Sequence, residues 1–372
     1  MNTPAIVTII QEYVPRYRAP LFREMRRLAA ERGIDLRIVA GTPQGAQAAR
    51  RDGDGFQVDE ELRQREIRIA GRRIGMRRTS RHFAESDLVV VEQARRNLDV
   101  YAAVLRGRRN IAMWGHGRDF TRASGRVSRG VLDALTRRAT WFFGYTEDSV
   151  EAAARAGVPE GRCTVLWNTT DTRSLRSDLS DLTPDEVARF REGLGVGPVA
   201  VFIGGLDSSK RLDFLVRACE EVAPKVEGFS LVVLGAGPAG PDLQALAAER
   251  PWMHVRPPAF GRELAIAFAS ADALAMPGRV GLIAVDALAA RVPVVTTDWH
   301  GHAPERAYLT SENSVTSHDS PSAYAEALSA VLSDRALNAR LRAACEGSDD
   351  LLSIEAMAAR FMSGIEGALD AS

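Results

Sequence analysis

The chain has 372 residues, of which 45% are hydrophobic and 26% are charged, and its 48 basic and 48 acidic side chains leave no net charge. This composition is typical of a globular protein, and the length is long for a single core, so we expect two domains. No apolar run approaches the roughly 20 residues of a membrane-spanning helix, and the amino-terminal residues lack the basic start of a signal peptide. Three widely spaced cysteines without metal-ligand spacing are typical of buried thiols in the reducing cytoplasm.

Charge is divided unevenly along the chain. Residues 1–175 hold 31 basic and 21 acidic side chains, a surplus of ten positive charges, and the other 17 basic and 27 acidic side chains give ten negative charges. The asymmetry indicates two modules, which we predict as domains at 1–175 and 176–372. Either the first module meets an anionic acceptor or a membrane surface, or the two halves use opposite charges to face each other.

Short apolar runs alternate with amphipathic helical stretches through the first half of the chain. This alternation predicts parallel strand–helix–strand units in which the strands are buried. The predicted strands are Ala5 to Ile10, Leu36 to Ala40, Leu88 to Glu92, Asn110 to Trp114, Trp141 to Thr146 and Cys163 to Trp167.

His116 follows the fourth of these strands and lies between two glycines. The carboxyl ends of parallel strands form the ligand-binding edge of such sheets. We therefore predict that His116 projects into a cleft and donates a hydrogen bond to a phosphate or a sugar hydroxyl. The alternative is a histidine that only hydrogen-bonds loop carbonyls.

Two segments of the first half are rich in charge but carry weaker signals. The run Arg72 to Arg78 mixes four arginines with two apolar residues and could rest on anionic lipid, although a solvated surface loop is the favoured interpretation. Asp52-Gly53-Asp54 resembles a metal-binding pair, but no apolar strand precedes it. No metal is expected there.

A polar segment at about 172–197 is predicted to connect the two domains. It contains one predicted helix, for which Thr183 and Glu186 have the spacing of a capping box.

A second series of strands and helices follows the connection, and the last residues form one long helix. The predicted strands are Val199 to Ile203, Leu231 to Leu234, His254 to Arg256, Ala271 to Met276 and Val292 to Thr297, with helices near 211–222, 242–249, 261–269 and 282–291. A final helix is predicted from Ser353 to about Leu369, and we expect it to pack back toward the N-terminal domain. The whole pattern predicts an α/β protein with two Rossmann-like domains facing each other across a cleft.

The first strand of this second series runs into two glycines, Gly204 and Gly205, and a cation follows at Lys210. Glycines allow the backbone to approach a ligand closely, and a lysine is a point charge suited to a diphosphate. Lys210 is one of only two lysines in the chain, which favours this interpretation over a solvated lysine in a turn.

A second glycine-containing turn, Pro-Gly-Arg-Val-Gly at 277–281, leads from a strand into the helix that begins at Leu282. The N-terminus of a helix offers N–H groups and a positive dipole end to an anion. Asp286 lies about one turn behind it, where a carboxylate could reach a ribose. The turn therefore predicts an anion-and-sugar site at the carboxyl end of a parallel strand.

Gly235 to Gly240 spells Gly-x-Gly-x-x-Gly after another predicted strand. Alone, this is a weak dinucleotide signal, and no acidic residue ends the next strand, where a ribose-binding carboxylate is expected. We interpret it as a tight turn that borders a nucleotide.

Together these motifs resemble those of the retaining glycosyltransferases of family 4, which have the GT-B fold, over most of the chain and most closely over 199–315. The family's Gly-Arg-Leu-x-x-x-Lys-Gly corresponds to Gly204-Gly205-Leu-Asp-Ser-Ser-Lys210-Arg211. Its Glu-Gly-Phe-Gly-Leu-x-x-x-Glu-Ala corresponds to Gly278-Arg279-Val280-Gly281-Leu282-Ile-Ala-Val-Asp286-Ala. The segment from Tyr13 to Phe22, with Arg16, Tyr17 and Arg18, is similar to the family's acceptor-side loop.

The resemblance implies a role for each matching residue. Lys210, with Gly204, Gly205 and Arg211 around it, would hold the diphosphate of a nucleotide-sugar donor. Asp286 would bind the ribose, and the turn of Gly278, Arg279, Val280, Gly281 and Leu282 would meet the phosphate or sugar. His116 would reach the transferred sugar or phosphate. Such enzymes retain the sugar's configuration, and they use no metal, no cofactor and no protein nucleophile.

The resemblance further implies a bacterial, cytoplasmic enzyme, with peripheral contact to the inner face of the membrane through 72–78 as an open question. Its acceptor would be a small molecule, a polysaccharide or a lipid-linked sugar, and no nucleic-acid partner is expected.

Three positions depart from the family pattern. Gly205 replaces the arginine that shares the diphosphate with the lysine, and Gly278 replaces a glutamate that grips the donor sugar. Asp286 is one methylene shorter than the usual glutamate. Two alternatives therefore remain beside the transferase: a nucleotide-sugar-binding or scaffold protein with weakened catalysis, and a GT-B nucleotide-sugar epimerase.

Overall fold

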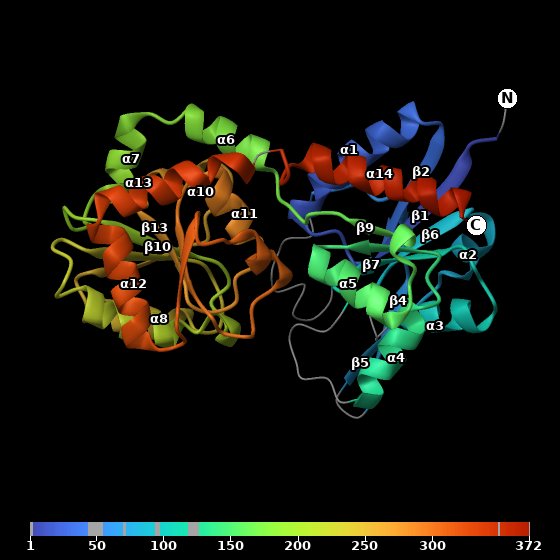
Figure 1. Cartoon of the computed structure of the whole chain (residues 1–372), viewed down its shortest axis with the longest axis horizontal. Coiled ribbons are helices and arrows are strands. Elements are labelled where there is room, and N and C mark those ends of the chain that lie inside the picture. The colour runs from blue at the N-terminus through green and yellow to red at the C-terminus, as the bar shows by residue number, and fades with distance from the viewer. Residues whose placement is uncertain are drawn as a thin grey trace. The chain divides into compact units, whose positions relative to one another are not determined.

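The computed structural model describes residues 3–43, 55–69, 72–93, 97–117, 126–348 and 350–371. The chain divides into two compact units, of which unit 1 is Met1–Asn168 with Ile354–Ser372 and unit 2 is Thr169–Ser353 (Figure 1). The crossing into unit 2 thus follows Asn168, a few residues before the expected boundary at 175. The segment at 172–197 folds as two helices that belong to unit 2, α6 (Thr172–Ser180) and α7 (Pro184–Arg191).

Unit 1 is built on a seven-stranded sheet in which every neighbouring pair is parallel, in the order β3-β2-β1-β6-β7-β8-β9. The strands are β1 (Ala5–Gln11), β2 (Ile34–Ala40), β3 (Glu60–Glu61), β6 (Leu88–Glu92), β7 (Ile111–Gly115), β8 (Trp141–Gly144) and β9 (Cys163–Val165). All six predicted strands are present. The sequence order reverses beside β1, which makes its carboxyl end a topological switch point, where such sheets bind ligands.

Three strands of unit 1 were not predicted. β3 has only two residues and pairs at the edge of the sheet. β4 (Gln64–Ile69) and β5 (Arg72–Arg77) form a separate antiparallel hairpin. Each of these arginine-rich strands has only two alternating apolar residues, too few for the pattern by which a half-buried strand is recognised. Most of the run at 72–78 is therefore a strand, and the surface loop favoured from the sequence was wrong.

Alternate residues of the unit 1 strands face two different hydrophobic cores. On β1, Val7 and Ile9 lie in one core, together with residues of two helices, and Ile10 lies in the other. The first core includes α1 (Ala19–Glu31) and α14 (Ile354–Asp370), which lie side by side in Figure 1. The second core includes α3 (Leu98–Leu105), α4 (Arg126–Thr136) and α5 (Glu147–Ala156). The remaining α-helix described in unit 1 is α2 (Ser80–Glu85).

The carboxyl-terminal helix α14 returns to unit 1, as the sequence predicted. The ring of Phe361 stacks on that of Phe143 with centroids 4.3 Å apart and meets Trp114 edge-on at 4.9 Å. A Cβ atom at Gly364 would lie 2.4 Å from the Phe143 ring, so the helix approaches β8 closely only because this residue lacks a side chain. Residues more than 200 positions apart in sequence therefore share one core.

Unit 2 is built on a six-stranded parallel sheet in the order β12-β11-β10-β13-β14-β15. The strands are β10 (Val199–Ile203), β11 (Ser230–Leu234), β12 (Met253–Arg256), β13 (Ala273–Met276), β14 (Val294–Thr297) and β15 (Ser314–Ser317). Five of them were predicted. β15 was missed because its sequence, Ser-Val-Thr-Ser, has a single apolar residue, which suffices at a sheet edge.

Helices cover both faces of the unit 2 sheet. Besides α6 and α7 they are α8 (Leu212–Val222), α9 (Gly240–Ala248), α10 (Arg262–Ala269), α11 (Ile283–Ala289), α12 (Pro321–Ser333) and α13 (Arg335–Ala344). The predicted capping box begins α7, where Glu186 Oε2 accepts a hydrogen bond of 2.8 Å from the Thr183 N–H. None of the helices described is both long and apolar enough to cross a membrane.

Removing the Phe361 ring tests whether α14 is part of the unit 1 core. Phe361→Ala is expected to lower the free energy of unfolding of unit 1 by about 3–5 kcal/mol, because it leaves a cavity between two aromatic rings. Glu366→Ala, on the exposed side of α14, removes only a surface ion pair with Arg32 and should cost less than about 1 kcal/mol. Urea unfolding followed by fluorescence measures both, and equal small losses would show that α14 does not hold unit 1 together.

Candidate functional site

In unit 2, the turn after β13 is hydrogen-bonded to the turn after β10, and both turns were predicted to bind the donor. The Nζ atom of Lys210 donates a hydrogen bond of 2.7 Å to the carbonyl oxygen of Arg279. In return, the Arg279 N–H donates to the Ser209 carbonyl at 2.9 Å. The two predicted glycine-containing turns are therefore one structure.

Lys210 is a half-buried cation among charged neighbours of both signs. Burial lowers the pKa of its ammonium to about 8, and the positive charge of Arg279 acts in the same direction. Asp207 and Glu305 oppose this shift. Glu305 is itself buried, with 4% of its surface exposed, and its carboxylate contributes to the electrostatics of this site.

Gly278 packs against the backbone of Lys210. A Cβ atom at Gly278 would lie 2.3 Å from the Lys210 carbonyl oxygen and 2.7 Å from its Cα, so no side chain fits without a shift of the backbone. Gly205 differs, because a Cβ atom there would meet only Asp207 Oδ2, at 3.2 Å. The two departures from the family pattern thus have different causes: packing requires glycine at 278, whereas it does not at 205.

Asp286 lies on α11 and bonds to the segment that enters unit 2. Its Oδ1 atom accepts a hydrogen bond of 2.6 Å from the Thr170 hydroxyl. Burial raises the pKa of the Asp286 carboxyl to about 6, and the bond from Thr170 opposes that shift. Thr170 was not singled out in the sequence, because a threonine in a polar segment carries no signal of its own. A carboxylate that already binds a hydroxyl is suited to a ribose.

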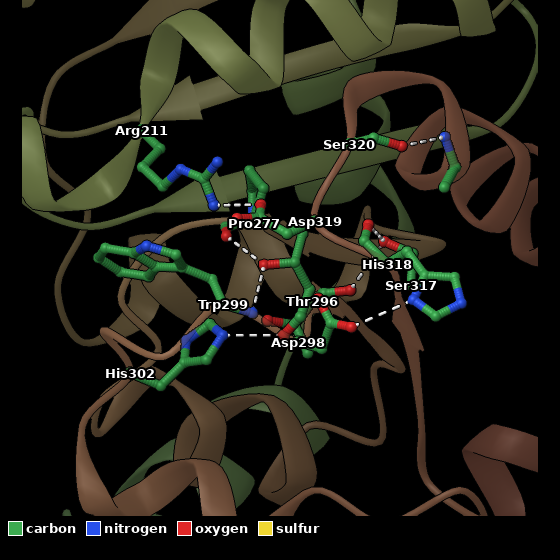
Figure 2. Close-up of polar contacts among 12 residues, drawn as sticks. Arg211, Pro277, Thr296, Asp298, Trp299, His302, Ser317, His318, Asp319 and Ser320 are labelled. Atoms are coloured by element: carbon green, nitrogen blue, oxygen red, sulfur yellow. Dashed lines mark hydrogen bonds and ion pairs between the residues drawn. The ribbon is translucent and has the colours of Figure 1, made fainter.

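Arg211 adopts a left-handed backbone conformation, with φ of 53°, where the family pattern has glycine. Such a conformation costs a non-glycine residue about 1–2 kcal/mol. Its guanidinium pairs with Asp319 at 2.5 Å and lies 5.2 Å from the Trp299 ring (Figure 2). It also lies 4.4 Å from the Phe214 ring. The guanidinium that was predicted to lie around the diphosphate is thus engaged with other side chains of unit 2.

The Gly-x-Gly-x-x-Gly segment after β11 forms a tight turn, packed against the turn after β10. A Cβ atom at Gly235 would lie 2.0 Å from the Gly204 carbonyl oxygen, and one at Gly237 would lie 2.5 Å from that of Leu206. The Leu206 N–H donates to the Ala236 carbonyl at 3.0 Å. These glycines serve close packing of two backbone turns.

A shallow cavity of about 420 Å³ lies at the carboxyl ends of β14 and β15. It contains none of the residues predicted to bind the donor, and it is lined by Asp298, Thr316, Ser317, His318, Ala323, Glu326 and Ala327.

In unit 1, the predicted acceptor-side residues divide into buried and exposed ones. Tyr13 and Arg18 are buried, whereas Arg16 and Tyr17 are exposed on the 3-10 turn that follows β1. The Arg18 guanidinium lies 4.0 Å from the centre of the Trp114 ring and donates a hydrogen bond of 2.8 Å to the Tyr145 hydroxyl.

His116 joins the same cluster at the carboxyl end of the sheet. Its ring centre is 4.5 Å from that of Tyr145, and burial raises the pKa of the Tyr145 phenol to about 12. The structure therefore brings Arg18 and His116 together through Tyr145, a residue that sequence reasoning missed. A tyrosine at the end of a predicted strand could have been noticed, because these strands all end at one edge.

The arginine-rich run at 72–78 contains a residue that is not at the surface. Arg77 is buried and forms an ion pair of 3.1 Å with Asp99, and Thr79 donates a further hydrogen bond of 3.1 Å to the same carboxylate. Arg77 thus cannot contact a membrane, because Asp99 on α3 draws it into the unit. Arg78 is exposed. Asp52-Gly53-Asp54 lies outside the described residues.

The raised pKa of Asp286 predicts how stability depends on pH. A carboxyl group whose pKa is higher in the folded state than in the unfolded state lowers stability as pH rises from about 4 to above 6. Asp286→Asn removes this charge and should raise the free energy of unfolding of unit 2 by about 1–2 kcal/mol at pH 8, with little gain at pH 4. Urea unfolding at both pH values measures it, with Asp213→Asn, exposed on α8, as control. A gain that is the same at both pH values would contradict the assignment.

Comparison with known proteins finds similarity to a glycosyltransferase family within the second unit. Residues 197–334 match the model of glycosyl transferases group 1. Over 177 residues the chain is 36% identical to a D-inositol 3-phosphate glycosyltransferase of Xylanimonas cellulosilytica, which covers 44% of this chain and 41% of that protein. It is also similar to a GDP-mannose-dependent alpha-(1-6)-phosphatidylinositol monomannoside mannosyltransferase of Mycobacterium tuberculosis, at 28% identity over 63% of each chain. The chain thus spans less than two thirds of each relative.

The fold is shared over the full length with a solved structure. Anabaena HepE in complex with UDP superimposes with a TM-score of 0.69 at 13% identity, covering 98% of this chain and 100% of that one. The two parallel sheets described above are those of the GT-B fold. Within its second unit, residues 197–334 are similar to the glycosyl transferases of group 1.

Proposed function

We propose that this protein is a metal-independent glycosyltransferase that moves a sugar from a nucleotide-diphosphate sugar to a hydroxyl acceptor with retention of configuration. The observation that carries the proposal is the hydrogen bond between Lys210 and Arg279, which joins two turns inside the segment that matches the family model. The free thiols Cys163, Cys219 and Cys345 support a cytoplasmic location.

The donor diphosphate would lie between Lys210 and the start of α11. An ammonium group has three N–H donors, and the Arg279 carbonyl takes one of them. In the described part of the chain, no hydrogen bond joins the N–H of Gly281 or Leu282 to another residue. A diphosphate there would receive a point charge from one side and backbone donors from the other. Asp286 would accept from the ribose hydroxyls as it accepts from Thr170.

Catalysis would consist of positioning and charge stabilisation. The bond between the sugar's anomeric carbon and the diphosphate oxygen breaks, and a bond to the acceptor oxygen forms on the same face. The proton of the acceptor hydroxyl passes to the departing diphosphate. Lys210 would stabilise the negative charge that develops on that group, and the turns that hold it supply a fixed geometry.

Unit 1 would bind the acceptor at the carboxyl end of its sheet, where Arg18, His116 and Tyr145 meet. The relatives are named for acceptors that contain phosphate, D-inositol 3-phosphate and phosphatidylinositol monomannoside. The surplus of ten positive charges in residues 1–175 also supports an anionic acceptor. The donor base is open, since one relative is named for GDP-mannose and one structural neighbour binds UDP.

The first test is a thermal-shift panel of UDP, GDP, dTDP and ADP and their sugars, followed by product analysis without an acceptor. A transferase should bind one nucleotide and hydrolyse its sugar slowly, and an epimerase should convert the sugar into its epimer. A scaffold protein would give binding without either product. Absence of any shift would overturn the proposal.

Lys210→Ala is expected to weaken binding of that nucleotide by roughly 10- to 150-fold, because a charge-assisted contact is worth about 1.5–3 kcal/mol. In the wild type, affinity should also decline above about pH 8, where the Lys210 ammonium loses its proton. Lys210→Arg stays charged and should not show that decline. Calorimetric titration from pH 7 to 9 measures both variants, and unchanged affinity in Lys210→Ala would remove Lys210 from the site.

Restoring the two missing family residues should give opposite results. Gly205→Arg fits the space available and adds a second cation beside Lys210, so we expect nucleotide affinity to rise several-fold. Gly278→Glu forces a side chain into the Lys210 backbone, which should destabilise unit 2 by about 1–3 kcal/mol and weaken binding. Melting temperature and nucleotide affinity of both variants provide the measurement. A stable, tight-binding Gly278→Glu protein would show that packing does not exclude the glutamate.

A further inference from the structure

His302 lies under the turn that follows β13, and both nitrogens of its ring are engaged. The backbone N–H of Val280 donates to Nδ1 at 3.2 Å. Nε2 lies 2.9 Å from the carbonyl oxygen of Thr297, a contact drawn as the dashed line from His302 in Figure 2. His302 is 8% exposed. The imidazole therefore bridges the end of β14 and the predicted donor-binding turn.

These two contacts select one protonation state of the ring. A backbone N–H can only donate, so Nδ1 must be an acceptor and carry no proton. A carbonyl oxygen can only accept, so Nε2 must carry the proton. Only the neutral imidazole with its proton on Nε2 makes both hydrogen bonds.

Protonation of His302 would break the contact with Val280. In the imidazolium, an N–H at Nδ1 would point at the N–H of Val280, and two donors repel each other. The turn would then lose one of its fixed points, because Val280 is fully buried and its own carbonyl oxygen accepts from the Ala303 N–H at 2.9 Å. The residues next along the chain are Gly281 and Leu282, which the proposed function assigns to the diphosphate.

The surroundings of His302 favour the neutral ring. Burial lowers the pKa of the imidazole, and the positive charges of Arg306, Arg211 and Arg279 act in the same direction, against the Thr297 bond. These arginines come from three different segments.

Two carboxylates, Asp298 and Glu305, lie within four residues of His302 in the sequence. Asp298, on the same loop as His302, is directed to His318 at 3.2 Å, and Glu305 acts on Lys210.

The ring is also fixed in orientation. Trp299 meets it edge-on, with centroids 5.7 Å apart at 83°, and the Arg211 guanidinium lies 5.2 Å from the Trp299 ring centre. A Cβ atom at Gly301 would collide with Trp299 at 2.2 Å. The sequence Trp-His-Gly-His at 299–302 thus folds back on itself to hold one imidazole in place.

We propose that His302 is a positioning residue, which holds the turn of 277–282 in its donor-binding shape only while its ring is neutral. The proposal rests on the proposed function for what the turn binds. It predicts that nucleotide affinity falls in acid because the turn is released.

The test compares variants that keep or lose the acceptor at Nδ1. In His302→Asn, the side-chain oxygen can take the place of Nδ1 but cannot be protonated, so binding should be a few-fold weaker than wild type at pH 7.5. His302→Gln places its amide near Nε2 instead and should bind still more weakly. His318→Asn, at an exposed histidine, is the matched control and should behave as wild type.

The decisive quantity is the ratio of wild-type to His302→Asn affinity between pH 7.5 and 5, for the nucleoside diphosphate that gives the largest thermal shift. Asp286 also titrates in this range, but it is present in both proteins and cancels in the ratio. The wild-type advantage should shrink several-fold as pH falls. A ratio that does not change with pH would overturn the proposal, provided that circular dichroism shows both proteins folded.

A nuclear magnetic resonance measurement tests the hydrogen bonds without any ligand. With ¹⁵N-labelled histidine, the chain gives only six imidazoles, and His302→Asn identifies the signal that belongs to His302. The expected signal is a neutral ring with its proton on Nε2 at pH 7, and the Val280 amide should shift when the ring takes up a proton in acid. A proton on Nδ1, or a ring protonated at pH 7, would refute the proposal. If no nucleotide binds, the proposed function fails, while this measurement still decides the role of His302.

Discussion

The candidate site depends on the contact between the turns after β10 and β13. Lys210 donates to the Arg279 carbonyl, and Gly278 lies so close to the Lys210 backbone that a Cβ atom would be 2.3 Å from its carbonyl oxygen. A cation that leaves water needs fixed partners, because desolvation disfavours its charge. The carbonyl of Arg279 supplies such a partner, and the glycine allows it to come near. Charge and chain geometry at this site are therefore set by the same contact.

The other contacts of the turn extend this constraint to the neighbouring strands. Thr297 binds the Pro277 carbonyl at 2.9 Å, and His302 and Ala303 bind the N–H and carbonyl of Val280. The turn is thus attached to the segment after β14 as well as to that after β10. A turn with this many partners changes little on ligand binding, and such preorganisation is what a site that stabilises charge requires. It also explains why a side chain at 278 is excluded while one at 205 is not.

Unit 1 is arranged differently, because aromatic packing replaces backbone contacts. Trp114 touches Phe361 of α14 with one part of its ring and lies under the Arg18 guanidinium with another. Tyr145 then links Arg18 to His116. The residues that would meet an acceptor are therefore supported by the last helix of the chain. Loss of packing by α14 would disturb the position of Arg18, because Trp114 contacts both Phe361 and the Arg18 guanidinium.

The sequence by itself determined the parallel strands, the two glycine-containing turns and the helix that ends the chain, and it singled out Lys210 and Asp286 as candidate site residues. Each of these has a local signal, such as an apolar run, a glycine beside a cation or a helical period. Only the tertiary structure decided that the chain enters unit 2 after Asn168, that Arg77 is drawn inward by Asp99, and that Gly278 packs on Lys210. It also decided that His302, Thr170 and Tyr145 contact the predicted residues. Each of these contacts joins residues that are many positions apart in the sequence. The packing of strands and helices brings such residues together, and a local sequence pattern contains no information about that packing.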